Sequence, residues 1–132
     1  MNSAKRVTGT ERITVSDSTL LLVDVQERLA PAIDDVEALL VNCGKLLKGA
    51  RRLEVPLVAT EHCPDAIGPT VPSLREKLQP QEIYRKSHFG ACDEVPFCER
   101  AAQQDRHQWV LCGVEAHVCL LQAALGLRTM EK

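Results

Sequence analysis

The chain has 132 residues, a length typical of one domain, and 45% of them are hydrophobic, which is enough for a sizeable core. Aromatic residues make up only 3%, so we expect an aliphatic core, and a formal net charge of −2 without a basic face argues against a nucleic-acid partner. No apolar run reaches the ~18 residues of a membrane span. The N-terminal MNSAKRVTGTER lacks the apolar core of a signal peptide. These features predict a cytoplasmic protein with no membrane association.

Six cysteines are spread along the chain, and without a secretion signal we expect them to be thiols rather than a disulfide framework. They are Cys43, Cys63, Cys92, Cys98, Cys112 and Cys119. No CxxC pair occurs, which disfavours a zinc ribbon or a thioredoxin-type redox site. His62 beside Cys63, and His88 near Cys92, match no known ligand spacing, so the sequence predicts no metal and no cofactor.

The elements are predicted from hydrophobic periodicity, in chain order. Residues 1–18 are polar and mixed in charge, and we expect an N-terminal arm there, before a domain of residues 19–132. Short apolar runs typical of buried strands occur at residues 20–25, 55–60, 82–85 and 108–112. Helical spacing of apolar residues follows each run, at residues 33–53, 73–78, 96–104 and 116–127. Ser73 is the expected N-cap of the second helix, and residues 61–72 are expected to form a loop.

This alternation of strands and helices predicts an α/β fold. The expected form is a doubly wound, Rossmann-like parallel sheet in a three-layer α/β/α arrangement. A strand order of 3-2-1-4 places the reversal of order between the first and fourth strands. Ligands bind beyond the carboxyl ends of the strands at such a reversal.

The stretch of residues 109–122, WVLCGVEAHVCLLQ, organises the predicted site. An apolar strand stops at Gly113, a short turn follows, and Cys119 falls in the first turn of the last helix. Free N–H groups and the positive end of the helix dipole favour a thiolate there. The alternative is an inert cysteine buried in an apolar helix.

Three reactive side chains follow the ends of predicted strands. Asp24 ends the first strand, Lys86 follows the third, and Cys119 follows the fourth across its turn. Asp24 could accept the thiol proton, and Lys86 could steady the resulting negative charge. The alternatives are that Asp24 is a helix N-cap or half of an Asp–Lys salt bridge, and that Lys86 is a solvated surface lysine.

Four motifs, taken together, resemble the isochorismatase-like cysteine hydrolases, in particular their isochorismatase-domain-containing branch. They are LLVDVQ at residues 21–26, ATEHCP at 59–64, YRKSHFGA at 84–91 and GVEAHVCLLQ at 113–122. The resemblance implies a triad of Cys119 as nucleophile, Asp24 as base and Lys86. It also implies hydrolysis of a small amide or related C–N acyl compound through a thioester. It further implies a cis peptide bond between Val114 and Glu115, which would help aim backbone N–H groups, with that of Cys119, at an oxyanion.

The same resemblance suggests which residues meet the substrate and which parts of the family are missing. The candidate substrate-binding residues are Gln26, Glu61, His88, Phe89 and His117. A nicotinamidase-type metal site is not expected, because residues 60–63 read Thr-Glu-His-Cys without an Asp-x-His pair. By the same resemblance, we expect a C-terminally short domain that lacks the later strands usual in the family.

Two functional hypotheses therefore remain from the sequence. The first is a cysteine hydrolase of a small-molecule substrate. The second is a non-catalytic, truncated relative that serves as a binding or oligomerisation module. A homo-oligomer is expected in either case, because the last helix is apolar nearly all round and must be buried.

Overall fold

The computed structural model describes residues 11–132, so the first ten residues of the predicted N-terminal arm lie outside the described part. Four parallel strands form one sheet in the order β3-β2-β1-β4, as the sequence predicted. The strands are β1 (Ser18–Val23), β2 (Leu57–His62), β3 (Ile83–Lys86) and β4 (Gln108–Gly113). The reversal of strand order therefore lies between β1 and β4.

The described residues also form five α-helices and four short 3-10 helices. The α-helices are α1 (Val36–Arg52), α2 (Pro64–Ile67), α3 (Pro72–Arg75), α4 (Val95–Gln103) and α5 (Cys119–Thr129). The 3-10 helices are Val15–Asp17, Ala30–Ala32, Pro80–Glu82 and Ala91–Asp93. No described helix combines the length and apolarity that crossing a bilayer requires.

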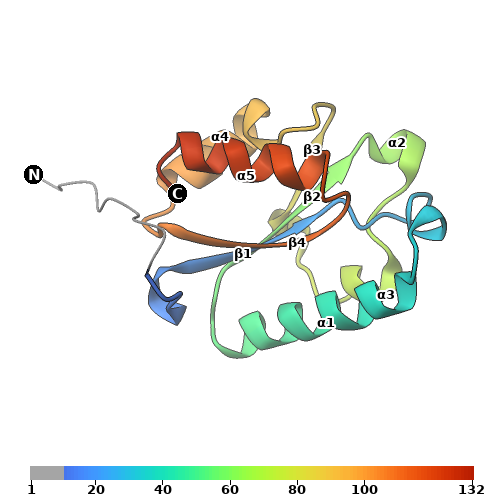
Figure 1. Cartoon of the computed structure of the whole chain (residues 1–132), viewed down its shortest axis with the longest axis horizontal. Coiled ribbons are helices and arrows are strands. Elements are labelled where there is room, and N and C mark those ends of the chain that lie inside the picture. The colour runs from blue at the N-terminus through green and yellow to red at the C-terminus, as the bar shows by residue number, and fades with distance from the viewer. Residues whose placement is uncertain (1–10) are drawn as a thin grey trace, which may run out of the picture.

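The helices cover the sheet on both faces, which confirms the three-layer arrangement (Figure 1). Alternate residues of β1 point to opposite faces. Leu20 and Leu22 pack in a core with α1 and α3, whereas Leu21 and Val23 pack in a second core with α4 and α5. All six residues of β1 are buried, which explains why the central strand reads as a continuous apolar run.

The structure corrects several predicted boundaries. The predicted loop of residues 61–72 contains α2, which Pro64 can open because its missing N–H costs nothing at a helix start. The helix predicted to begin after Ser73 is α3, which begins at Pro72 with Val71 as its N-cap residue. The last helix begins at Cys119, three residues later than predicted. The predicted arm gives way to the sheet at Ser18, the first residue of β1.

Candidate active site

The carboxyl ends of β1 and β4 are joined closely enough to bring Asp24 and Cys119 together. Gly113 pairs with Val23 and has a φ of +123°, and an added Cβ there would lie 2.1 Å from the Val23 carbonyl oxygen. Only glycine fits this approach. Asp24 itself has a φ of +51°, a left-handed conformation that aspartate tolerates better than most residues. These two turns position the site.

Asp24 and Lys86 form an ion pair inside the protein. Oδ2 of Asp24 lies 2.8 Å from Nζ of Lys86, and both side chains are 1% exposed. The other carboxylate oxygen, Oδ1, accepts a hydrogen bond of 2.8 Å from the Thr60 hydroxyl. A buried pair of this kind is retained only where its charges are mutually satisfied, since each is costly to desolvate. Asp24 is thus half of a salt bridge, and Lys86 is not a surface lysine.

The Lys86 ammonium is surrounded by acceptors. Besides Asp24, it donates to the backbone carbonyls of His88 at 3.1 Å and Phe89 at 3.2 Å. Nδ1 of His62 lies 3.2 Å away and Sγ of Cys119 lies 3.6 Å away. The positive charge is therefore placed beside the sulfur atom on which a negative charge would develop.

Cys119 is the first residue of α5 and is buried, with 8% of its surface exposed. The sequence predicted a position that favours the thiolate, but the pKa of Cys119 is raised to about 11. Burial is the largest cause, followed by a hydrogen bond to Asp24 and the negative charge of that carboxylate, while Lys86 opposes them. The resting side chain is therefore a thiol.

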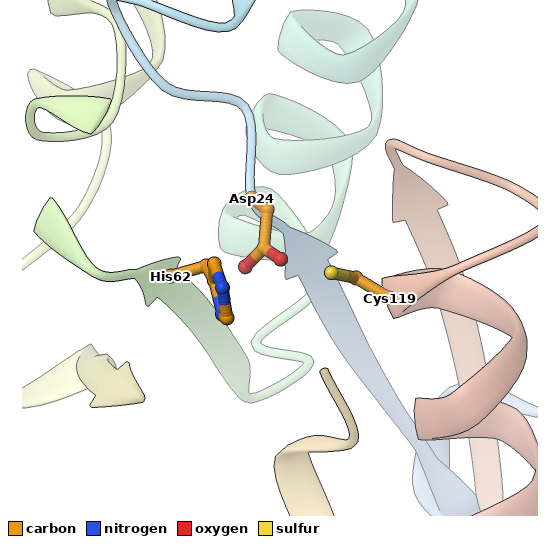
Figure 2. A group of neighbouring side chains, drawn as sticks. All are labelled: Asp24, His62 and Cys119. Atoms are coloured by element: carbon orange, nitrogen blue, oxygen red, sulfur yellow. The ribbon is translucent and has the colours of Figure 1, made fainter. Parts of the chain in front are cut away.

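Asp24, His62 and Cys119 also offer ligand atoms that lie within 4.8 Å of one another. Figure 2 shows the Asp24 carboxylate between the His62 ring and the Cys119 sulfur. Carboxylate, imidazole and thiolate are the ligands that Zn²⁺ prefers. However, the Lys86 ammonium is within 3.6 Å of an atom of each of the three residues. We therefore assign the cationic position to Lys86 rather than to a metal ion.

The turn between β4 and α5 contains the implied cis peptide bond, which joins Val114 and Glu115. The carbonyl of Glu115 accepts hydrogen bonds from the N–H groups of Val118 at 3.1 Å and Leu120 at 3.2 Å. Between those two donors lies the Cys119 N–H, for which the described residues provide no hydrogen-bond acceptor. That N–H is thus available to a ligand. The oxyanion role of Val114, Glu115 and Cys119 stays a prediction.

Two of the predicted substrate-binding residues are buried and bonded within the chain. The Gln26 side-chain amide donates to the carbonyls of His62 at 2.9 Å and Gly68 at 2.8 Å, and its oxygen accepts the His62 N–H at 2.8 Å. Glu61 accepts hydrogen bonds from the N–H and hydroxyl of Thr70, at 2.7 and 2.8 Å. Both side chains hold residues 62–70 against the strand ends, and their contact with substrate stays a prediction.

The other three predicted substrate-binding residues lie at the surface. Phe89 is 58% exposed and stacks on the His62 ring. The His88 ring lies 2.7 Å from Glu94, and the His117 ring lies 4.0 Å from Glu115. All three belong to the loops after β3 and β4, and their contact with substrate stays a prediction.

Thr60 and His62 were not among the residues that the sequence assigned to the site. Thr60 pairs with Val23 in the sheet, next to Asp24, and His62 pairs with Lys86. A signal for both was present, because the predicted strand order sets the end of the second strand between the ends of the first and third. Polar residues spaced by two on that strand share one face and therefore point at the same site.

Comparison with known proteins supports one family. The isochorismatase domain family matches residues 18–129. Isochorismatase domain-containing protein 2 of Danio rerio is 36% identical over 126 residues, covering 93% of this chain and 62% of that protein. The Homo sapiens protein of the same name is 34% identical over 117 residues, covering 88% and 55%. The chain thus spans less than two thirds of the length of these relatives.

Solved structures agree with this match. A structure titled as the MAR1 ribonuclease of Caenorhabditis elegans is 32% identical, with a TM-score of 0.83 over 92% of this chain and 62% of that one. YcaC from Pseudomonas aeruginosa, solved with covalent acrylamide, is 27% identical, with a TM-score of 0.80 over 92% and 62%. The chain belongs to the isochorismatase domain family and has the fold of its hydrolases.

Proposed function

We propose that this chain carries the catalytic centre of a cysteine hydrolase that acts on a small amide or a related C–N acyl compound. The observation that carries the proposal is the buried ion pair of Asp24 and Lys86 in contact with the Cys119 thiol. A cation beside the sulfur and a carboxylate able to take its proton are what an activated cysteine nucleophile needs. Neither a purely structural thiol nor a surface cysteine needs both.

The raised pKa of Cys119 is compatible with this role because the proton need not leave the site. Loss of the proton to solvent would leave two buried anions, Asp24 and the thiolate, against one cation. Transfer of the same proton from Cys119 to Asp24 leaves one anion beside Lys86, as before, so the buried net charge is unchanged. The pKa of about 11 describes loss of the proton to solvent, whereas catalysis uses its transfer to Asp24.

The reaction then proceeds in two balanced halves. Asp24 takes the thiol proton, and Sγ of Cys119 forms a bond to the carbonyl carbon. Asp24 returns that proton to the leaving nitrogen as the C–N bond breaks, which leaves a thioester. Water then gives a proton to Asp24 and its oxygen bonds to the acyl carbon. As the C–S bond breaks, Asp24 restores the proton to sulfur. The Cys119 N–H and Lys86 offset the negative charge of each tetrahedral intermediate.

Two titles among the relatives bear on the class of substrate. The YcaC structure was solved with covalent acrylamide, a small amide whose carbon–carbon double bond also reacts with nucleophiles such as thiols. This supports acrylamide as a probe of Cys119. Another relative is titled a ribonuclease. The net charge of −2 and the absence of a basic face in this sequence disfavour a polyanionic substrate for this chain.

The test is a panel of small amides with a coupled assay for released ammonia, on the native chain and on Cys119→Ala. We expect at least one amide to be hydrolysed by the native chain, with intact mass showing an acyl adduct that the Cys119→Ala variant lacks. Full activity of Cys119→Ala on that amide would refute the nucleophile. Binding of amides without adduct or turnover would instead support the non-catalytic binding or oligomerisation module.

The chain is further proposed to form a homo-oligomer. Leu121 and Leu125 of α5 are 42% and 53% exposed, and within the described residues β4 pairs only with β1. An unpaired strand edge beside an apolar helix face favours association. Light scattering at micromolar concentration should give a mass above that of one chain, and a stable monomer would refute the proposal.

A further inference from the structure

The backbone of His62, at the end of β2, is held by hydrogen bonds from outside its own strand. The side-chain amide of Gln26 binds it as a second peptide group would, accepting from its N–H at 2.8 Å and donating to its carbonyl at 2.9 Å. The next residue, Cys63, has a φ of +40°, and its N–H donates to the Lys86 carbonyl at 2.8 Å. These bonds fix His62 against both β1 and β3.

The His62 ring is held as well. It stacks on the ring of Phe89, with centroids 5.4 Å apart and planes 19° from parallel. Its Nδ1 lies 3.2 Å from Nζ of Lys86. An ammonium group has three donors and no acceptor, so this hydrogen bond requires Nδ1 to be the acceptor. In this hydrogen bond the ring is the tautomer that carries its proton on Nε2.

We infer that His62 is a positioning residue, whose neutral ring holds the Lys86 ammonium beside the sulfur of Cys119. This role rests on the proposed function, because it matters only if that cation serves the thiolate. His62 touches neither the substrate carbon nor its leaving group in this role. It acts through Lys86.

The position of the Lys86 ammonium depends on how its hydrogen bonds are divided among its neighbours. Lys86 has three protons and five neighbouring acceptors, of which two are the carbonyls of His88 and Phe89 in its own loop. Those two draw Nζ toward the loop, whereas Asp24 and His62 draw it toward the strand ends. Without an acceptor at residue 62, the pull toward the strand ends is weaker, and the carbonyls of His88 and Phe89 would draw Nζ away from Cys119. The thiolate would then lose part of its cation.

Asparagine and leucine make a matched pair at this position because they have nearly the same shape and differ in their polar atoms. Both His62→Asn and His62→Leu lose the stacking on Phe89. Only asparagine offers an oxygen near the place of Nδ1. We expect His62→Leu to slow labelling of Cys119 by iodoacetamide at neutral pH by about tenfold, the usual scale for a hydrogen bond to a charged group. His62→Asn should restore the rate to within about threefold of the native chain.

Peptide mass after timed labelling gives the rate at Cys119 alone, with Lys86→Met as the reference for complete loss of the cation. Equal slowing in His62→Asn and His62→Leu would overturn the inference, because only the lost stacking would then matter. Labelling that Lys86→Met slows but His62→Leu does not would also overturn it, while leaving the proposed function intact. Inertness of Cys119 in the native chain would overturn both.

A measurement on the native chain reports directly where the His62 ring carries its proton. The ¹⁵N chemical shifts of the histidine rings distinguish a protonated from an unprotonated Nδ1. We expect His62, assigned by its disappearance in His62→Asn, to show an unprotonated Nδ1. A His62 that carries its proton on Nδ1 cannot accept from Lys86 and would overturn the inference.

Discussion

Two cysteines at the end of β4 and the start of α5 have raised pKa values for different reasons. The pKa of Cys119 is raised by burial and by Asp24, and its Sγ lies 3.6 Å from Nζ of Lys86. The pKa of Cys112 is raised first by a hydrogen bond to the Cys43 thiol and then by burial. The Cys112 side chain packs against the core beneath α1. The two sulfur atoms thus belong to opposite faces of the sheet, one beside an ion pair and the other among apolar groups.

The comparison teaches that a raised thiol pKa does not by itself separate a nucleophile from a core residue. Burial raises the pKa at both sites, and a hydrogen bond raises it further, to Asp24 at Cys119 and to Cys43 at Cys112. The difference is the fate of the proton, because Cys119 has a carboxylate that can take it and a cation that remains beside the sulfur. Cys112 has another thiol, Cys43, as its hydrogen-bond partner.

The largest effect is expected from Asp24→Asn. The amide keeps the shape and can still accept from Thr60, but it cannot take the thiol proton. Turnover of any amide found in the panel should fall by about 10²–10⁴-fold, the range for positioned proton transfer. Steady-state kinetics on the folded variant provide the measurement. Turnover within threefold of the native chain would show that another group is the base.

Lys86→Met should come next, with effects on both stability and reactivity. Removing one partner of a buried ion pair typically costs about 3–5 kcal/mol, because Asp24 is left as an unpaired charge. Urea unfolding measures that loss, and Lys48→Met, at an exposed position of α1, is the matched control. The variant should also raise the pKa of Cys119 further, since the one group that lowers it is gone. Unchanged unfolding and labelling would contradict the proposed place of the cation.

Cys112→Ala should have a smaller and purely structural effect. Loss of a partly buried side chain that packs against the core should cost about 1 kcal/mol in the free energy of unfolding. Labelling of Cys119 should keep its native rate, because Cys112 lies on the other face of the sheet. A large fall in Cys119 labelling without unfolding would break the separation between the two sites.

The smallest effect concerns the loop after β3. The pKa of Glu94 is lowered to about 2, first by the hydrogen bond from the Ser87 N–H and then by His88. Because the pKa is depressed from its ordinary 4.5, the stabilisation is present above about pH 4.5 and is lost as the pH falls toward about 2. Glu94→Gln should flatten this part of the pH–stability curve. Glu99→Gln, on the exposed face of α4, should leave it unchanged.

The sequence was sufficient to predict the strand order and the meeting of Asp24, Lys86 and Cys119. Buried parallel strands read as apolar runs, and the reversal of order places three strand ends side by side. What could not be predicted depends on contacts between distant residues. The hydrogen bond from the His62 N–H to the Gln26 side chain and the one from Thr60 to Asp24 each span 36 positions. The thiol pKa was predicted in the wrong direction, because the helix start was weighed without burial and the nearby carboxylate.

The most direct test of the central claim is competitive labelling of the six cysteines of the native chain with acrylamide at neutral pH, read by peptide mass. We expect Cys119 to react first, and Asp24→Asn and Lys86→Met each to slow this reaction while the slower labelling of the other five thiols is unchanged. Faster reaction at Cys98 or Cys43, with Cys119 inert in the folded protein, would show that the three residues do not act together as an activated nucleophile.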